Sequence, residues 1–167
     1  QGNGIYTDEL IANTDVYRNI VANVTEGGIK QHDNTNVTAR NNILFNCGMG
    51  LNPLNNSRGN HMKSNTVLNR ADVVPREARG QGFLGLVASD QDAATAIDSN
   101  AYYDFHRPNP FRQSDDPYAW LTFSEWKKMI SDDANSTFDG TPLNKGEYEK
   151  LFYNETKTRK RINLGST

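Results

Sequence analysis

The stretch Asn42-Ile-Leu-Phe-Asn46 is one of four copies of a short pattern that decides the fold of this chain. Each copy begins with asparagine, continues with a mostly apolar trio and ends with asparagine or aspartate. The other copies are Asn19-Ile-Val-Ala-Asn23, Asn65-Thr-Val-Leu-Asn69 and Asn100-Ala-Tyr-Tyr-Asp104. The first three copies begin 23 residues apart. A fixed period of this length is typical of a solenoid, in which each unit packs against its neighbours.

A second pattern, led by glycine, precedes each copy of the first. Its members are Gly4-Ile5, Gly28-Ile29, Gly50-Leu51 and Gly85-Leu86, and the intervals from glycine to asparagine are 15, 14, 15 and 15 residues. Each unit therefore holds two short β-type runs joined by polar turns, without helical periodicity. We interpret residues 1–105 as about four coils of an all-β protein, a parallel β-helix.

Equivalent residues of successive coils should form columns, because coils stack at the strand spacing of about 4.8 Å. We expect the residues that follow the glycines to stack inward and the leading asparagines to hydrogen-bond to one another at a turn. The inward column would contain Ile5, Ile29, Leu51 and Leu86, and the turn column Asn19, Asn42, Asn65 and Asn100.

The repeat is predicted to stop after Asp104. Residues 106–144 then form a connector, in which Thr122-Phe-Ser-Glu125 has the pattern of a capping box and begins a short helix over about 122–131. The apolar face of this helix would close the end of the solenoid; its residues are Phe123, Trp126 and Ile130. Residues 145–167 contain two strand candidates and are predicted to form a β-hairpin at the start of a further β-domain.

Composition narrows the classes of partner. The 167-residue chain has a formal net charge of −2, which gives it no general attraction for nucleic acid or an anionic membrane. Cys47 is the single cysteine, so no internal disulfide is possible, and no Cys/His cluster has zinc spacing. No apolar run reaches transmembrane length. Five N-x-S/T sequons are compatible with secretion; they begin at Asn23, Asn36, Asn55, Asn135 and Asn154.

Several segments resemble right-handed parallel β-helix proteins of the pectate-lyase-like type. The segments that resemble their coils are Gly2-Asn-Gly-Ile-Tyr-Thr-Asp-Glu9, Gly27-Gly-Ile-Lys-Gln-His32 and Asn41-Asn-Ile-Leu-Phe-Asn46. Phe123-Ser-Glu-Trp126 resembles the helix after the last coil, and Leu151-Phe-Tyr-Asn-Glu-Thr156 with Ile162-Asn-Leu-Gly165 resembles the opening of a small β-sandwich. The resemblance implies the C-terminal portion of a secreted or periplasmic, polysaccharide-active protein. Its partners would be a polysaccharide and the remaining N-terminal coils or another chain.

A candidate catalytic site follows from strand alternation, which predicts that Tyr6 and Asp8 point outward, next to Lys30 and His32 of the following coil. A carboxylate beside an imidazole can set the tautomer and raise the basicity of the histidine. Such a group can perform the general acid/base steps of sugar cleavage. A hydrolase would add a second carboxylate, Glu9 or Asp33, whereas a lyase would use a base and a cation for the uronate. The competing interpretation is a solvated ladder of polar residues.

A second, weaker group of residues could bind substrate. Asn52 continues the outward column above Lys30, and the next outward positions are expected to be Val87 and Ser89. Arg76, Arg79 and His61, with Lys63, could line a cleft for an anionic polymer, since arginine binds carboxylate or sulfate through two hydrogen bonds. No metal site is predicted and no cofactor is expected; calcium remains conceivable, but no motif supports it.

Together these patterns predict a β-helix protein that binds a polysaccharide and cleaves it as a glycoside hydrolase or a polysaccharide lyase. The alternative is a non-catalytic β-helix, either a carbohydrate-binding adhesin or tailspike or a structural subunit of a larger assembly.

Overall fold

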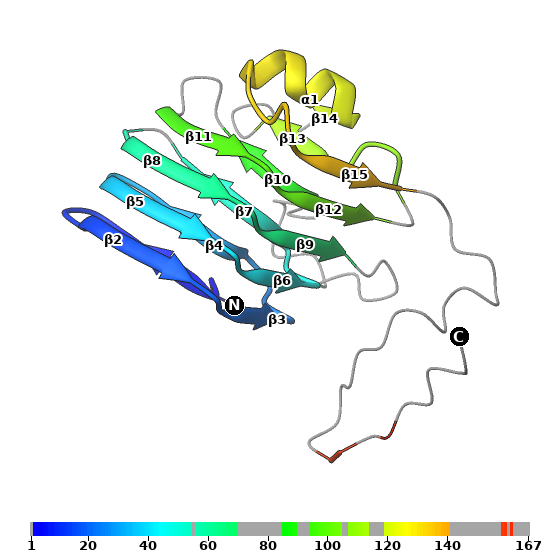
Figure 1. Cartoon of the computed structure of the whole chain (residues 1–167), viewed down its shortest axis with the longest axis horizontal. Coiled ribbons are helices and arrows are strands. Elements are labelled where there is room, and N and C mark those ends of the chain that lie inside the picture. Colours follow the sequence, from blue (N-terminus) through cyan, green and yellow to red (C-terminus); the bar gives the residue numbers. More distant parts are fainter. Residues whose placement is uncertain are drawn as a thin grey trace.

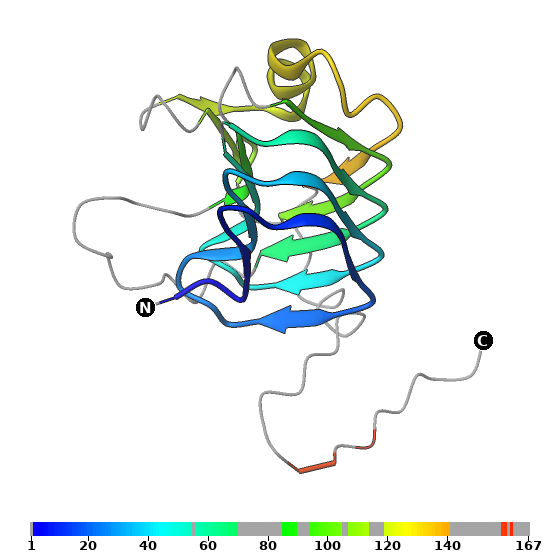
Figure 2. The ribbon, with the colours of Figure 1, turned by 90° about the vertical axis from the view of Figure 1, so that its left-hand side faces the viewer.

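The computed structural model describes residues 2–54, 56–69, 85–89, 94–104, 107–113, 119–140, 158, 159 and 161. These residues are mostly strands in three parallel sheets, here called sheets A, B and C (Figure 1). Consecutive strands enter sheets A, B and C in turn, and each pairs in parallel with its equivalent one repeat later. The levels formed in this way lie above one another in Figure 2. The arrangement is compatible with a parallel β-helix.

Each sheet takes one strand from each level. Sheet A contains β1 (Ile5–Thr7), β4 (Gly27–Gln31), β7 (Met49–Pro53), β10 (Gly85–Ser89), β13 (Phe111–Gln113) and the antiparallel β14 (Trp120–Leu121). Sheet B contains β2 (Ala12–Tyr17), β5 (Thr35–Arg40), β8 (Arg58–Lys63) and β11 (Ala94–Asp98). Sheet C contains β3 (Ile20–Ala22), β6 (Ile43–Phe45), β9 (Thr66–Asn69), β12 (Ala101–Asp104) and β15 (Thr137–Asp139). The predicted all-β parallel class is confirmed.

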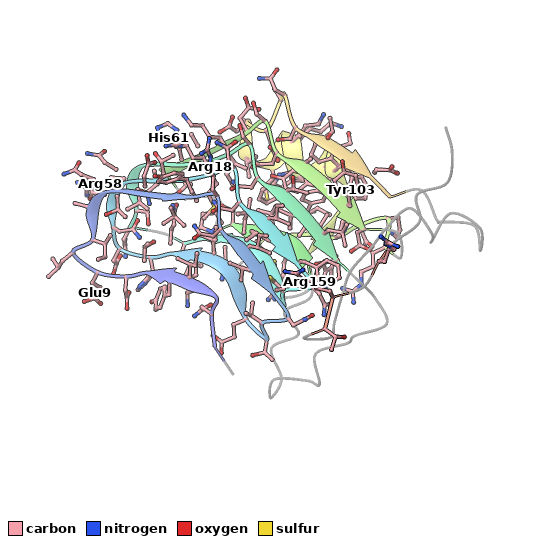
Figure 3. The ribbon with its side chains drawn as sticks, turned by 60° about the horizontal axis from the view of Figure 1, so that its bottom comes forward. Glu9, Arg18, Arg58, His61, Tyr103 and Arg159 are labelled. Atoms are coloured by element: carbon pink, nitrogen blue, oxygen red, sulfur yellow. The ribbon has the colours of Figure 1, made fainter. Side chains whose placement is uncertain are left out.

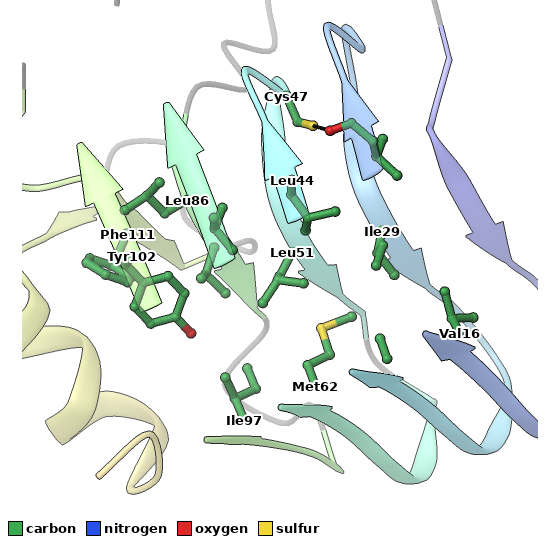
Figure 4. Packing of buried hydrophobic residues seen from close by; sticks show 14 of the residues in the cluster. Val16, Ile29, Leu44, Cys47, Leu51, Met62, Leu86, Ile97, Tyr102 and Phe111 are labelled. Atoms are coloured by element: carbon green, nitrogen blue, oxygen red, sulfur yellow. Dashed lines mark hydrogen bonds between the residues drawn. The ribbon is translucent and has the colours of Figure 1, made fainter. Parts of the chain in front are cut away.

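The predicted inward column exists over its first three positions. Ile5 pairs with Ile29 and Ile29 with Leu51, so the three residues lie in register across β1, β4 and β7. Ile29 and Leu51 have no exposed surface. Figure 4 shows both side chains among the buried apolar residues between the sheets. Successive levels therefore bury their apolar side chains against one another, as a solenoid requires.

The glycine before each of these residues allows two levels to approach closely. A Cβ at Gly4 would lie 2.2 Å from Cγ1 of Val21, and one at Gly50 would lie 2.2 Å from Cγ1 of Val67. The same added atom at Gly50 would lie 2.6 Å from the carbonyl oxygen of Leu86. Any larger residue would clash with both a core side chain and the backbone of the next level, which explains the glycine-led pattern.

Gly85, the fourth glycine of the pattern, is shifted by one residue in the strand register relative to the other three. Gly85 pairs with Met49, and Val87, rather than Leu86, pairs with Leu51. The predictions that Leu86 continues the inward column and that Val87 points outward are therefore wrong. Val87 is fully buried in the column, and Leu86 occupies the corner position that is glycine in earlier levels.

The predicted asparagine column is confirmed and forms a continuous hydrogen-bond ladder. In each step the backbone N–H and the side-chain amide of one asparagine donate to the side-chain oxygen of the next. The donor-to-oxygen distances are 3.0 and 3.0 Å for Asn19 to Asn42, 3.1 and 2.9 Å for Asn42 to Asn65, and 2.8 and 3.1 Å for Asn65 to Asn100. The ladder ends where the backbone N–H of Asn100 donates to Ser136 Oγ at 2.7 Å. It satisfies buried polar groups at the turn from sheet B to sheet C.

The repeat continues one level beyond Asp104, contrary to the prediction. Strand β13 pairs in parallel with β10, and β15 pairs in parallel with β12, so sheets A and C each gain a fifth parallel strand. Sheet B has four strands among the described residues. Phe111 pairs with Val87 and is fully buried, so the inward column continues into the segment that the sequence indicated to be a connector.

The predicted helix is confirmed as α1 (Phe123–Ile130), with the capping box between Thr122 and Glu125 formed in both directions. Its apolar face packs on the end of the core, and Trp126 is fully buried there. The indole ring stacks on Phe111 with 5.6 Å between ring centroids. In the part of the chain that the structure describes, no helix is long and apolar enough to cross a membrane. Most of residues 145–167, where a hairpin was predicted, lie outside the described residues.

Candidate functional site

Four side chains meet where sheet A turns toward sheet B. Tyr6 in β1 pairs in register with Lys30 in β4, and Asp8 and His32 follow these strands directly. The backbone N–H of His32 donates to the carbonyl oxygen of Thr7 at 3.0 Å, which extends the parallel pairing past the strand ends. The structure therefore brings together all four predicted catalytic residues. We call Tyr6, Asp8, Lys30 and His32 the dyad cluster.

One carboxylate oxygen is the centre of the dyad cluster. Asp8 Oδ1 lies 3.0 Å from His32 Nδ1 and accepts a hydrogen bond from the hydroxyl of Tyr6 at 2.8 Å. The Tyr6 hydroxyl also lies 3.3 Å from His32 Nδ1. Because an ionised carboxylate only accepts hydrogen bonds, Nδ1 carries the proton in this contact. The lone pair of the neutral imidazole is then on Nε2.

The hydrogen bonds shift the proton affinities of Asp8 and Tyr6 in opposite directions. The bonds from His32 and Tyr6 lower the pKa of Asp8 below its usual value. Desolvation and the bond to Asp8 raise the pKa of Tyr6 to about 12. Asp8 is therefore a carboxylate and Tyr6 a neutral phenol at neutral pH. This assigns Tyr6 as a hydrogen-bond donor and removes it from the candidate bases.

Lys30 and Asp33 supply charges next to the dyad. The ammonium of Lys30 lies 4.8 Å from the centre of the Tyr6 ring, within the range of a cation–π contact. Asp33 Oδ2 lies 3.7 Å from His32 Nε2, on the other side of the imidazole from Asp8. Sequence reasoning offered Asp33 or Glu9 as the second carboxylate, and the structure places Asp33 at the imidazole. Its position directly after His32 in the chain was the signal for it.

The predicted substrate-binding residues are less closely grouped. Asn52 pairs in register with Lys30, as expected, but only 8% of it is exposed. His61 is exposed on sheet B, between Thr38 and Ala96, and Figure 3 shows it well away from Glu9 at the dyad-cluster turn. Arg76 and Arg79 lie outside the described residues.

The outward column of sheet A also differs from the prediction in its fourth level. Ser89, expected outward, is only 2% exposed and lies in register with Gln113. The outward position of that level belongs to Ala88, which is 3% exposed and pairs with Arg112. The open part of this column is consequently its beginning, at Tyr6 and Lys30.

The described residues contain no group of three or more His, Cys, Asp or Glu side chains that could hold a metal ion.

The lowered pKa of Asp8 leads to a test of the geometry. We expect the Asp8 carboxyl to titrate below the ordinary aspartate value, and Tyr6→Phe to raise its pKa because one of its two side-chain donors is lost. The stabilisation by Asp8 is full above the unfolded-state pKa and is lost as the pH falls through the lower folded-state pKa. Carboxyl-carbon NMR titration measures this value. Titration of Asp8 at or above the ordinary value in the wild type would contradict the hydrogen bonds.

Comparison with known proteins gives no relative from which a role could be transferred, since no family model, no curated protein and no solved structure matches the chain.

Proposed function

We propose that this protein is a secreted, right-handed parallel β-helix protein of the pectate-lyase-like type that binds a polysaccharide and cleaves it at the dyad cluster. The observation that carries the proposal is the shared Asp8 oxygen, which accepts from both His32 and Tyr6. A carboxylate that holds the Nδ1 proton of an imidazole orients the ring and leaves the lone pair on Nε2, as in the histidine bases of many enzymes. The open, extended sheets of stacked strands also suit a polymer.

The reaction that these residues support best is elimination from a uronate-containing polysaccharide. His32 Nε2 would remove the proton on the carbon next to the uronate carboxylate. The electron pair of that C–H bond becomes a C=C bond, and the bond to the oxygen of the next sugar breaks. That oxygen takes up a proton from water, and His32 afterwards returns the proton that it removed to water. Lys30 would bind the uronate carboxylate and stabilise the charge that develops on it.

The pKa of Asp8 favours elimination over hydrolysis. Hydrolysis requires a carboxylic acid that protonates the leaving oxygen, and its pKa must be raised toward neutrality. The pKa of Asp8 is lowered instead, by hydrogen bonds from His32 and Tyr6. Asp8 therefore suits the orienting role in a base-catalysed reaction.

The main test compares two site variants with a surface control. Against a panel of polyuronates, we expect His32→Ala to reduce kcat/KM by about a hundredfold or more, as loss of a proton-transfer group does. Lys30→Ala should also lower activity on these carboxylate-bearing substrates. Lys128→Ala, which removes an exposed lysine of α1, is the matched control and should leave activity unchanged. The unsaturated product is followed by its ultraviolet absorbance.

A binding-only function is the second candidate, because the side chain of Asp8 is 52% exposed and that of His32 is 29% exposed. Catalytic dyads usually lie in clefts from which water is excluded. An adhesin, a tailspike or a structural subunit would present the same residues for recognition only. Tight binding of a glycan with no turnover by the wild type on any polysaccharide would establish this alternative and end the catalytic proposal.

A further inference from the structure

The outer face of sheet B carries two regular columns of side chains. Strand register places Tyr17, Arg40, Lys63 and Asp98 in one column and Asp15, Thr38, His61 and Ala96 in the other. Both columns run across all four strands of the sheet, so their members repeat at the strand spacing of about 4.8 Å. Alternate residues of the same strands, among them Val16, Ala39, Met62 and Ile97, are buried in the core.

This face is positively charged although the whole chain is not. Its cationic side chains are Arg18, Arg40, Arg58 and Lys63, and its acidic ones are Asp15 and Asp98, which gives 4 − 2 = +2. The complete chain has a formal net charge of −2. We call this group of four cations the sheet B cation face. Figure 3 shows Arg18, Arg58 and the nearby His61 along one side of the molecule.

The two acids on this face already have partners within the protein. Asp15 receives hydrogen bonds from Arg40 Nη2 at 2.8 Å and Nε at 3.3 Å. Asp98 receives them from the side-chain and backbone nitrogens of Asn135, at 2.7 and 2.8 Å. These bonds lower the pKa of both carboxyl groups, so both remain ionised and engaged.

Three of the four cations, by contrast, form no ion pair, although Lys63 is near enough to Asp15 to help lower the pKa of that carboxyl group. Within the described ranges, Arg18, Arg58 and Lys63 form no ion pair and no side-chain hydrogen bond, and all three are exposed. Arg40 is held in place by Asp15 and by the ring of Tyr17, 4.7 Å from its guanidinium carbon. The face therefore consists of one fixed cation and three that are available to a ligand.

The outward side chains described on the other two sheets include no comparable group of exposed cations. On sheet A the outward residues Ala88 and Arg112 are 3% and 5% exposed. On sheet C, the outward residues Ile20 and Ile43 lie in register and are 75% and 46% exposed, but both are apolar. Among the described residues, sheet B is thus the sheet whose outward side chains include several exposed cations.

The sheet B cation face is continuous with the dyad cluster. The backbone N–H of Arg58 donates to the carbonyl oxygen of Asn34 at 3.0 Å, two residues after His32. Arg58 also pairs in register with Thr35, the first residue of β5. A chain that leaves the dyad cluster across this corner meets Arg58 first and then reaches Lys63 along the same strand.

We propose that the sheet B cation face binds an acidic polysaccharide, carboxylated or sulfated, whose flanking sugars extend from the dyad cluster. This rests on the proposed function and names the class of polymer that it requires. Several exposed cations on one face suit a polymer that carries repeated anionic groups. Interspersed hydroxyl and amide groups, from Thr38 and Asn36, suit the hydroxyl-rich sugar ring more than a phosphate backbone.

Charge reversal on sheet B tests the proposal. Affinity electrophoresis in gels containing polygalacturonate, dextran sulfate or neutral dextran compares the wild type with Arg58→Glu, Lys63→Glu and the double variant. We expect each single reversal to weaken binding of both anionic polymers by about 3- to 10-fold at low salt, with the loss much reduced in high salt. Lys128→Glu, the same charge change on α1, should bind as the wild type does. Neutral dextran should not bind.

The outcomes separate this proposal from the catalytic one. Unchanged affinity for anionic polymers in the double variant, or equal affinity of the wild type for neutral dextran, would overturn the sheet B proposal. Tighter binding of a single-stranded oligonucleotide of equal charge would overturn it as well. Loss of polymer binding in the double variant supports the sheet B proposal. This holds even if His32→Ala leaves cleavage unchanged, a result that would contradict only the catalytic role of the dyad cluster.

Discussion

Replacing Trp126 with alanine is expected to lower the free energy of unfolding by about 3 to 5 kcal/mol, as the loss of a fully buried aromatic side chain does. Trp126 has no exposed surface and stacks on Phe111, the last member of the inward column. Its indole N–H donates to Asp133 Oδ2 at 2.8 Å, and the Tyr102 hydroxyl donates to the same oxygen at 3.0 Å. The substitution would leave a cavity and remove one donor from a buried carboxylate whose pKa is raised by desolvation.

A second variant separates the two effects. Trp126→Phe keeps an aromatic ring in the cavity and removes the N–H, while Tyr102 still donates to Asp133 Oδ2. It should therefore cost about 1 to 3 kcal/mol, the contribution of one hydrogen bond to a buried carboxylate. Urea unfolding followed by circular dichroism gives both values. A cost below about 1 kcal/mol for Trp126→Ala would show that α1 does not cap the core.

Replacing Asn65 with alanine is expected to cost about 3 to 6 kcal/mol, because several buried groups lose their partners at once. Asn65 Oδ1 accepts from the backbone and the side chain of Asn42, and its amide donates to Ala39 O at 3.0 Å and to Asn100 Oδ1 at 3.1 Å. Only 1% of Asn65 is exposed, so water cannot replace these bonds easily.

The matched control is the asparagine at the open end of the same ladder. Asn19 is half-buried and donates to Asn42 from its backbone and side chain. Asn19→Ala retains the backbone donor and leaves the remaining groups within reach of water, so it should cost about 1 kcal/mol. Equal destabilisation by the two substitutions would contradict the role of burial in the ladder. The readout is the midpoint and slope of urea unfolding.

Much of the fold could be predicted because its contacts connect residues at a constant separation. Nearly equal separations of 24 and 23 residues place Ile5 beside Ile29 and Asn19 beside Asn42, as the structure confirms. The helix was equally accessible, since a capping box acts within four residues. Both signals are local or strictly periodic, and neither depends on the shape of the rest of the molecule.

The errors arose where the period changes. Gly85 was matched to Gly50 by residue type, but the strands pair so that Val87 meets Leu51. The fifth level was missed because Phe111-Arg-Gln113 follows a proline-rich segment and lacks the glycine and asparagine that mark earlier levels. Its place in sheet A is decided by pairing with β10 and packing under Trp126, which are contacts across the fold.

In the dyad cluster, too, the sequence predicted which residues are neighbours, whereas the atomic contacts depend on the tertiary structure. The repeat register by itself predicted that Tyr6 lies beside Lys30. Extending this register past the strand ends predicted that Asp8 lies beside His32. Only the tertiary structure decided that one oxygen of Asp8 serves both neighbours, that Asp33 stands at Nε2, and that Asn52 is covered.

By itself, the sequence determined which residues share a column, because a constant repeat makes equal positions neighbours in parallel strands. It also determined that the end of the stack has a helix. The tertiary structure decided which columns remain exposed, how the last level is completed and which hydrogen bonds orient the histidine. These properties depend on what packs over each face and on side-chain directions, and neither is encoded in the length of a repeat.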